Sequence, residues 1–133
     1  MQGMNDMKSR TAGLGRILRA MRYSAQGLRA AWQHEAAFRQ EVYAFAVLAP
    51  LTLALKLPTL HLVVLLALMG AVLATELVNS AIEAIVDKVS PEKHPLAGRA
   101  KDCGSAAVMV VVLTLTGAWL ALAGPAAWQL VAG

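Results

Sequence analysis

Four polar side chains stand out in an otherwise apolar stretch of the sequence: Glu76, Asn79, Glu83 and Asp87. They are separated by three, four and four residues, so on an α-helix they lie along one face. Ionisable groups at membrane depth are costly and usually functional. The structural alternative is a set of interhelical hydrogen bonds, with partners such as Ser105. Two glutamates, an asparagine and an aspartate in register favour a chemical site.

Two further sets of polar residues could contribute to the same chemical site. Arg99, Lys101, Asp102 and Ser105 open a later apolar segment, and Lys101 and Ser105 are spaced to share a helix face. The alternative for this set is anchoring to lipid headgroups. The motif EAAFRQE places Glu35, Arg39 and Glu41 just before the first apolar span, where a solvated junction is the alternative.

Carboxylates that converge with a lysine are suited to magnesium–phosphate chemistry. Mg²⁺ is commonly held by one or two carboxylates together with phosphate oxygens. A lysine offsets charge on the transferring phosphoryl group, and a further carboxylate accepts the proton of the attacking hydroxyl. The sequence contains neither GxxxxGK[ST] nor the protein-kinase motifs, so any use of ATP requires a different arrangement.

The elements that must position these groups are helices in a membrane. The 133 residues are 58% hydrophobic and 15% charged, against about a quarter charged in soluble domains. We predict one all-α membrane domain over residues 1–133: an amphipathic surface helix at 14–34, then transmembrane helices at 36–57, 59–89 and 99–123. The stretch 90–98, SPEKHPLAG, is expected to form a loop.

The lysines and arginines predict the orientation in the membrane. Seven lie in residues 1–41, four in 88–101 and none afterwards, which places the N-terminus and the second connection in the cytoplasm and the C-terminus in the periplasm. All three polar sets then lie at one cytoplasmic depth. The positive charge faces lipid headgroups, and no nucleic acid partner is expected.

Several segments resemble one protein family. GLRAAW (27–32), EAAFRQE (35–41), ELVNSAIEAIVDK (76–88) and GRAKDCGSAAV (98–108) are similar to the prokaryotic diacylglycerol kinases, which include the undecaprenol kinases. The resemblance covers about residues 14 to 120. It implies a homotrimer in the bacterial inner membrane that uses ATP and Mg²⁺ to phosphorylate diacylglycerol to phosphatidic acid.

The resemblance also implies residue roles. Glu76 would be the general base, Asn79 would orient it, and Glu35 and Glu83 would hold the metal that bridges the ATP phosphates. The expected contacts to ATP are Arg16, Tyr23, Glu92, Lys93, His94, Lys101 and Asp102. The expected lipid site comprises Arg16, Arg29, Ala30, Ala31, Trp32, Ala37, Phe38, Arg39, Gln40, Glu41, Glu76 and Ser105.

Three alternatives stay open on the sequence. The nearest is the same transfer to undecaprenol; diacylglycerol is preferred because GLRAAW and EAAFRQE look closer to the Gram-negative members of the family. A second is a proton-coupled transporter in which Glu76 carries the proton. The third is a non-catalytic membrane assembly subunit, in which the acidic residues would be replaceable without loss of turnover.

Overall fold

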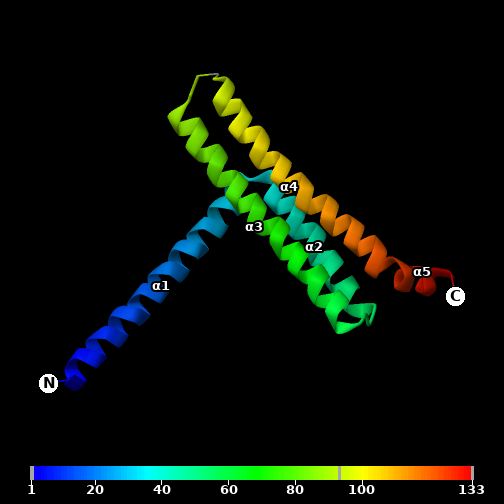
Figure 1. Ribbon diagram of the computed structural model, residues 1–133, viewed down its shortest axis with the longest axis horizontal. Helices are drawn as coiled ribbons and strands as arrows, with labels where there is room; N and C mark the ends of the chain where they lie inside the picture. The colour runs from blue at the N-terminus through cyan, green and yellow to red at the C-terminus, as the bar shows by residue number, and fades with distance from the viewer. Residues whose placement is uncertain (1, 93, 133) are drawn as a thin grey trace. The chain divides into compact units, whose positions relative to one another are not determined.

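The computed structural model describes the backbone of residues 2–92 and 94–132, and the side chains in this range from residue 13 onward. Within these residues the chain is helical with no strand, which confirms the all-helical class. The helices in chain order are labelled in Figure 1. The chain divides into two compact units, Met1–His34 and Glu35–Gly133, and each is described by itself.

The first unit is the helix α1, Gln2–His34. It begins at Gln2 rather than at Leu14, because the polar residues ahead of Leu14 carry no apolar periodicity that could mark a helix in the sequence. Its apolar side chains are exposed, among them Leu14, Ile17, Leu18 and Met21. An exposed apolar face is what a helix on a membrane surface would need, and the placement of α1 at that surface stays a prediction.

The second unit opens with α2, Ala36–Ala54, which continues through Pro50. The helix stops before the predicted end at residue 57, because Lys56 adopts a left-handed conformation with a φ of 50°. The Lys56 amide bonds the carbonyl of Leu53 at 3.4 Å, which closes the last turn. A left-handed residue with a side chain costs roughly 1–2 kcal/mol. Pro58 then caps the next helix.

The helices α3, Thr59–Val89, and α4, Pro95–Leu122, form a long hairpin (Figure 1). α3 packs most extensively against α4 and less against α2. Its buried residues recur every three or four positions, the spacing of a helix that presents one seam to its neighbours. The core of the unit is formed by Leu55, Leu65, Met69, Val72, Leu115 and Ala123.

The connection between α3 and α4 is shorter than the predicted loop at residues 90–98. α4 begins at Pro95, four residues before the predicted start, and His94 caps it by accepting a hydrogen bond from the Leu96 amide at Nδ1, 3.2 Å away. A proline marks loops in a sequence but is also favoured in the first turn of a helix, where its missing amide hydrogen is not needed. After Ala123, a short helix α5, Gly124–Ala132, completes the described chain.

Two of the described helices, α3 and α4, are long and apolar enough to cross a membrane. α2 is not one of them, because the polar residues Arg39, Gln40 and Glu41 near its start lower its mean hydropathy. The structure therefore supports a membrane protein with two candidate spans. The predicted third span, at 36–57, stays a prediction.

Candidate functional site

The second half of α3 carries the predicted acidic face. Glu76 is only 4% exposed and Asn79 only 8%, whereas Glu83 is half-buried and Asp87 exposed, so burial decreases along this face toward the α3–α4 turn. The neighbouring hydroxyl of Ser80 donates to the Glu76 backbone carbonyl at 2.9 Å, and that of Thr75 donates to the Ala71 carbonyl at 2.7 Å. Both hydroxyls are thus satisfied by their own helix, and the Glu76 carboxylate does not receive them.

Asn79 and Glu83 are joined directly. The Asn79 Nδ2 group donates to Glu83 Oε1 at 3.3 Å, one turn further along α3. This bond fixes the side-chain direction of Glu83, and it leaves the second carboxylate oxygen of Glu83 for another partner. The Oδ1 atom of Asn79 is buried and has no hydrogen-bond partner within the described part of the chain.

Two glutamates at the start of α2, Glu35 and Glu41, complete a set that we call the acidic group, whose other members are Glu76, Asn79 and Glu83. Glu35 and Glu83 are both near enough to Glu76 to interact with it electrostatically, and Glu76 in turn acts on Glu41. Glu35 stands at the N-cap position of α2 in extended backbone, yet its carboxylate makes no capping hydrogen bond to the described first turn. One oxygen of Glu41, Oε2, is buried without a partner among the described residues. The structure therefore places Glu35, Glu41 and Glu83 within electrostatic range of Glu76.

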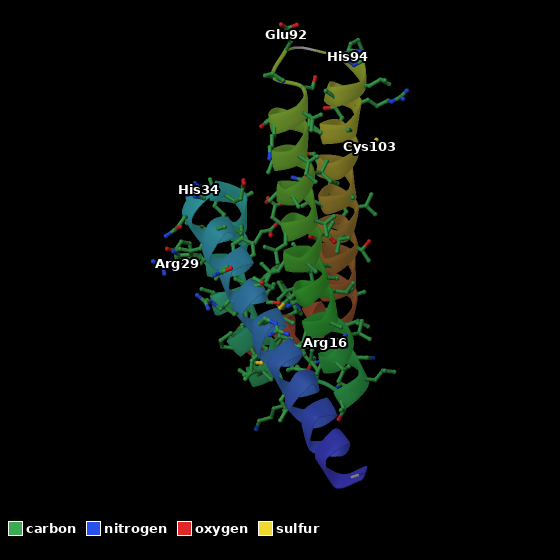
Figure 2. The ribbon with its side chains drawn as sticks, turned by 90° about the vertical axis from the view of Figure 1, so that its left-hand side faces the viewer. Arg16, Arg29, His34, Glu92, His94 and Cys103 are labelled. Atoms are coloured by element: carbon green, nitrogen blue, oxygen red, sulfur yellow. The ribbon has the colours of Figure 1, made fainter. Side chains whose placement is uncertain are left out.

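A cavity of about 500 Å³ lies where α3 and α4 meet, and we call it the polar cavity after the charged side chains among its otherwise largely apolar lining. Its lining includes Glu92, His94 and Lys101, three of the residues expected to contact ATP, and the turn that carries Glu92 and His94 is visible in Figure 2. Asp87 also lines it and accepts a hydrogen bond from Lys101 Nζ at 3.0 Å. Asp87 is not among the nucleotide contacts that the sequence predicts, although its four-residue spacing from Glu83 places it on the same face.

A second, apolar cavity of about 300 Å³ lies between α2, α3 and α4. Glu41 is the ionisable residue in its lining, and Thr116 and Trp119 contribute from α4. The remaining lining residues are aliphatic or aromatic: Ala44, Phe45, Leu48, Val72, Val112 and Leu115. A cavity of this composition suits a hydrocarbon chain that has a polar group at one end.

Other predicted site residues lie outside these groupings. Asp102 and Ser105 are exposed on α4 and line neither of the two cavities. The first turns of α2 carry Ala37, Phe38, Arg39 and Gln40, of which Phe38 is buried. α1 carries Arg16, Tyr23, Arg29, Ala30, Ala31 and Trp32, and Figure 2 labels Arg16 and Arg29 on this helix. Lys93 lies outside the described residues.

The donor set of the acidic group is compatible with magnesium. Among the described residues, no group of three or more histidine, cysteine, aspartate or glutamate side chains could hold a metal alone. Glu35 and Glu83 nevertheless provide carboxylate oxygens that are not used up by helix capping or by Asn79. Magnesium prefers oxygen ligands and is typically bound by one or two carboxylates together with substrate phosphates.

The sequence of this chain is similar to those of known lipid kinases. The model of the prokaryotic diacylglycerol kinase family matches residues 22–123. The curated diacylglycerol kinase of Escherichia coli (strain K12) is 43% identical over 116 residues, which cover 87% of this chain and 95% of that protein. The diacylglycerol kinase of Pseudomonas aeruginosa (strain PAO1) is 47% identical over 107 residues, or 80% and 87% of the two chains. That of Haemophilus influenzae is 38% identical over 110 residues, or 83% and 93%.

Proposed function

The chain belongs to the prokaryotic diacylglycerol kinase family, and from this premise we propose how it transfers the γ-phosphoryl group of ATP to diacylglycerol. The product is phosphatidic acid, and the protein is a lipid kinase, a membrane phosphotransferase. The observation that carries the mechanism is a buried carboxylate, Glu76, which lies in an apolar helix within electrostatic range of three other carboxylates.

Glu76 is the general base of this proposal. Its carboxylate accepts the proton of the primary hydroxyl of diacylglycerol as the hydroxyl oxygen attacks the γ-phosphorus of ATP. The bond from the γ-phosphorus to the bridging oxygen breaks in line with this attack, and ADP leaves. Little covalent chemistry falls to the protein, so its main contributions are orientation and the balance of charge around the phosphates. Asn79 orients the Glu83 carboxylate, to which its side-chain amide donates a hydrogen bond, and it helps in this way to arrange the groups around Glu76.

The nucleotide enters from the cytosol into the polar cavity between α3 and α4. Its volume of about 500 Å³ and its lining by Lys101, His94 and Glu92 support this placement. Lys101 offsets charge on the phosphates, as lysines do in other phosphoryl-transfer sites. Glu35 and Glu83 would hold Mg²⁺ against the phosphate oxygens, and the bound ion would neutralise charge on the transferring group.

The lipid reaches Glu76 from the side, through the bilayer. Support for this route comes from the apolar cavity beside Glu41, whose lining suits an acyl chain. The roles expected of α1 residues, of Asp102 and of Ser105 stay predictions, as do the homotrimer and a third span formed by α2. The predicted topology, with the N-terminus cytoplasmic and the C-terminus periplasmic, belongs to the same proposal.

Phosphate transfer from γ-labelled ATP tests the reaction. Purified protein in micelles receives dioleoylglycerol or undecaprenol, with Mg²⁺ present or omitted. We expect magnesium-dependent labelling of dioleoylglycerol above that of undecaprenol. Labelling mainly of undecaprenol would show that the lipid substrate is a polyprenol. Folded protein that labels neither lipid would refute the proposed kinase activity.

Replacement of the general base gives the first prediction. Glu76→Gln keeps the shape of the side chain but removes the proton acceptor, so kcat should fall by about 100-fold or more. Thr75→Val is the matched control one residue away, because the Thr75 hydroxyl is already satisfied by the Ala71 carbonyl and its loss should leave kcat intact. Near-normal turnover of a folded Glu76→Gln variant would show that the base lies elsewhere.

A further inference from the structure

One glycine of α4 lies directly against the amide in the acidic group. Gly104 is buried, and a Cβ atom built on it would overlap Asn79 Oδ1 while standing 3.4 Å from Cγ and 3.8 Å from Cα of the same residue. α4 can therefore reach this part of α3 only because residue 104 has no side chain. The overlap involves the side chain of a residue that is only 8% exposed, on the most extensive helix contact of the unit, where there is little room to move aside.

The orientation of that carboxamide is set by chemistry. Its Nδ2 group must face Glu83 Oε1, 3.3 Å away, because two acceptor oxygens would repel each other. The opposite end, Oδ1, then faces the backbone of Gly104 and stays without a hydrogen-bond partner among the described residues. A side chain at position 104 would push on Oδ1 and rotate the amide, and the rotation would break its bond to Glu83.

We propose that Gly104 is a positioning residue for phosphoryl transfer, because its missing side chain holds the Asn79 carboxamide in the orientation that aims the Glu83 carboxylate. This inference rests on the proposed function, since it assigns a further residue to the same site. Gly104 acts through Asn79 and does not touch the substrate. The sequence holds no sign of this role, because a glycine beside Ser105 in an apolar helix reads as a small packing residue.

The test compares two glycine-to-alanine changes on one helix. Gly104→Ala should lower kcat by about 10- to 100-fold, the loss that accompanies displacement of a positioned group by an ångström or less. It should also raise the Mg²⁺ concentration needed for half-maximal activity, because Glu83 is misdirected, while the KM for diacylglycerol changes little. Gly117→Ala is the matched control: beyond the adjacent backbone of its own helix, no described atom lies within 4 Å of its added Cβ, so kcat and the magnesium requirement should stay as in the wild type.

A double-mutant cycle separates positioning from general damage to the helix pair. In an Asn79→Ala background the carboxamide is gone, so Gly104→Ala should cause no further loss of kcat. The same double variant should assemble even where Gly104→Ala alone does not fold. A fully active Gly104→Ala variant would overturn the inference, as would an equal loss in both backgrounds or a double variant that also fails to fold. Wild-type protein that does not label diacylglycerol would instead refute the proposed function itself.

Discussion

Lys101 lines the polar cavity and pairs with Asp87, another residue of the same lining. Its ammonium group lies 3.0 Å from Asp87 Oδ1, and its side chain is 37% exposed against 67% for Asp87. Exposed ion pairs contribute little to stability, because water screens both charges and two flexible side chains must be ordered. The pair is therefore better understood as a way to hold the Lys101 ammonium beside the cavity than as a support for the fold.

Replacement of Lys101 and replacement of Asp87 should therefore have different effects. Lys101→Met should raise the KM for ATP by about tenfold, the size expected for the loss of one charge-assisted hydrogen bond. Asp87→Asn keeps a hydrogen-bond acceptor for Lys101 and should change the KM for ATP less than Lys101→Met does. Steady-state kinetics with varied Mg·ATP measure both. An unchanged KM for ATP in the Lys101→Met variant would show that Lys101 does not contact the nucleotide.

At the scale of the helix, one seam of α3 serves two purposes. Leu65, Met69 and Val72 fill the core in the first half of the helix, and the same three-and-four spacing continues with Glu76 and Asn79. The acidic group is thus a continuation of the packing seam, and it is buried for the same geometric reason as the core. Along this seam, the apolar residues belong to the core and the polar residues belong to the proposed site.

One hydrogen bond joins α2 and α4 in the apolar part of the second unit. Thr52 is fully buried on α2; its hydroxyl donates to the Leu48 carbonyl at 2.7 Å and accepts a hydrogen bond from the Trp119 indole N–H of α4 at 3.0 Å. A tryptophan near the end of an apolar span is common in the aromatic belt at a membrane interface. The structure adds a hydrogen bond between two helices that are distant in the chain, made in surroundings with few other polar partners.

Thr52→Val tests this contact. Valine has nearly the same shape but leaves the indole N–H of Trp119 unpaired, so the free energy of unfolding should fall by about 1–2 kcal/mol. Thr114→Val is the control, because Thr114 is exposed and its hydroxyl bonds only the Val110 carbonyl of its own helix. Unfolding in mixed micelles followed by circular dichroism gives both values. Equal stability of the two variants would show that the Thr52–Trp119 bond contributes nothing measurable.

At the scale of the molecule, the placement in the membrane connects the site with its two substrates. The cavity at the α3–α4 turn must open to the cytosol to receive ATP, whereas Glu76 must lie where the lipid hydroxyl can reach it. α3 is long enough for both: it spans 31 residues, and an apolar core of about 30 Å requires about 20. The part beyond Glu76 can then extend into the headgroup layer.

The single cysteine provides a direct test of this orientation. Cys103 is exposed on α4, close to the polar cavity, and is labelled in Figure 2. In inverted membrane vesicles, whose cytoplasmic face is outward, a membrane-impermeant maleimide should modify it. In a Cys103→Ala background, Trp128→Cys on α5 should react only in vesicles of the opposite orientation. Modification of both positions from the same side would contradict the predicted topology.

Some features of the site followed from local spacing and others did not. The shared face of Glu76, Asn79 and Glu83 could be predicted, because positions along one helix are fixed by its 3.6-residue turn. The early start of α4 could not, since Pro95 is compatible with a loop as well as with a first helical turn. Gly104 was missed because nothing in its neighbourhood indicates that Asn79 lies opposite.

The sequence by itself determined the helical class, the membrane setting, the acidic face of α3 and the kinship with diacylglycerol kinases, because composition, periodicity and motifs are properties of neighbouring residues. Only the tertiary structure decided which groups meet across helices: Lys101 with Asp87, Thr52 with Trp119, Gly104 with Asn79. Such contacts depend on the rotation and the register at which two helices pack. Those quantities are set jointly by many side chains along the whole contact, and no single motif encodes them.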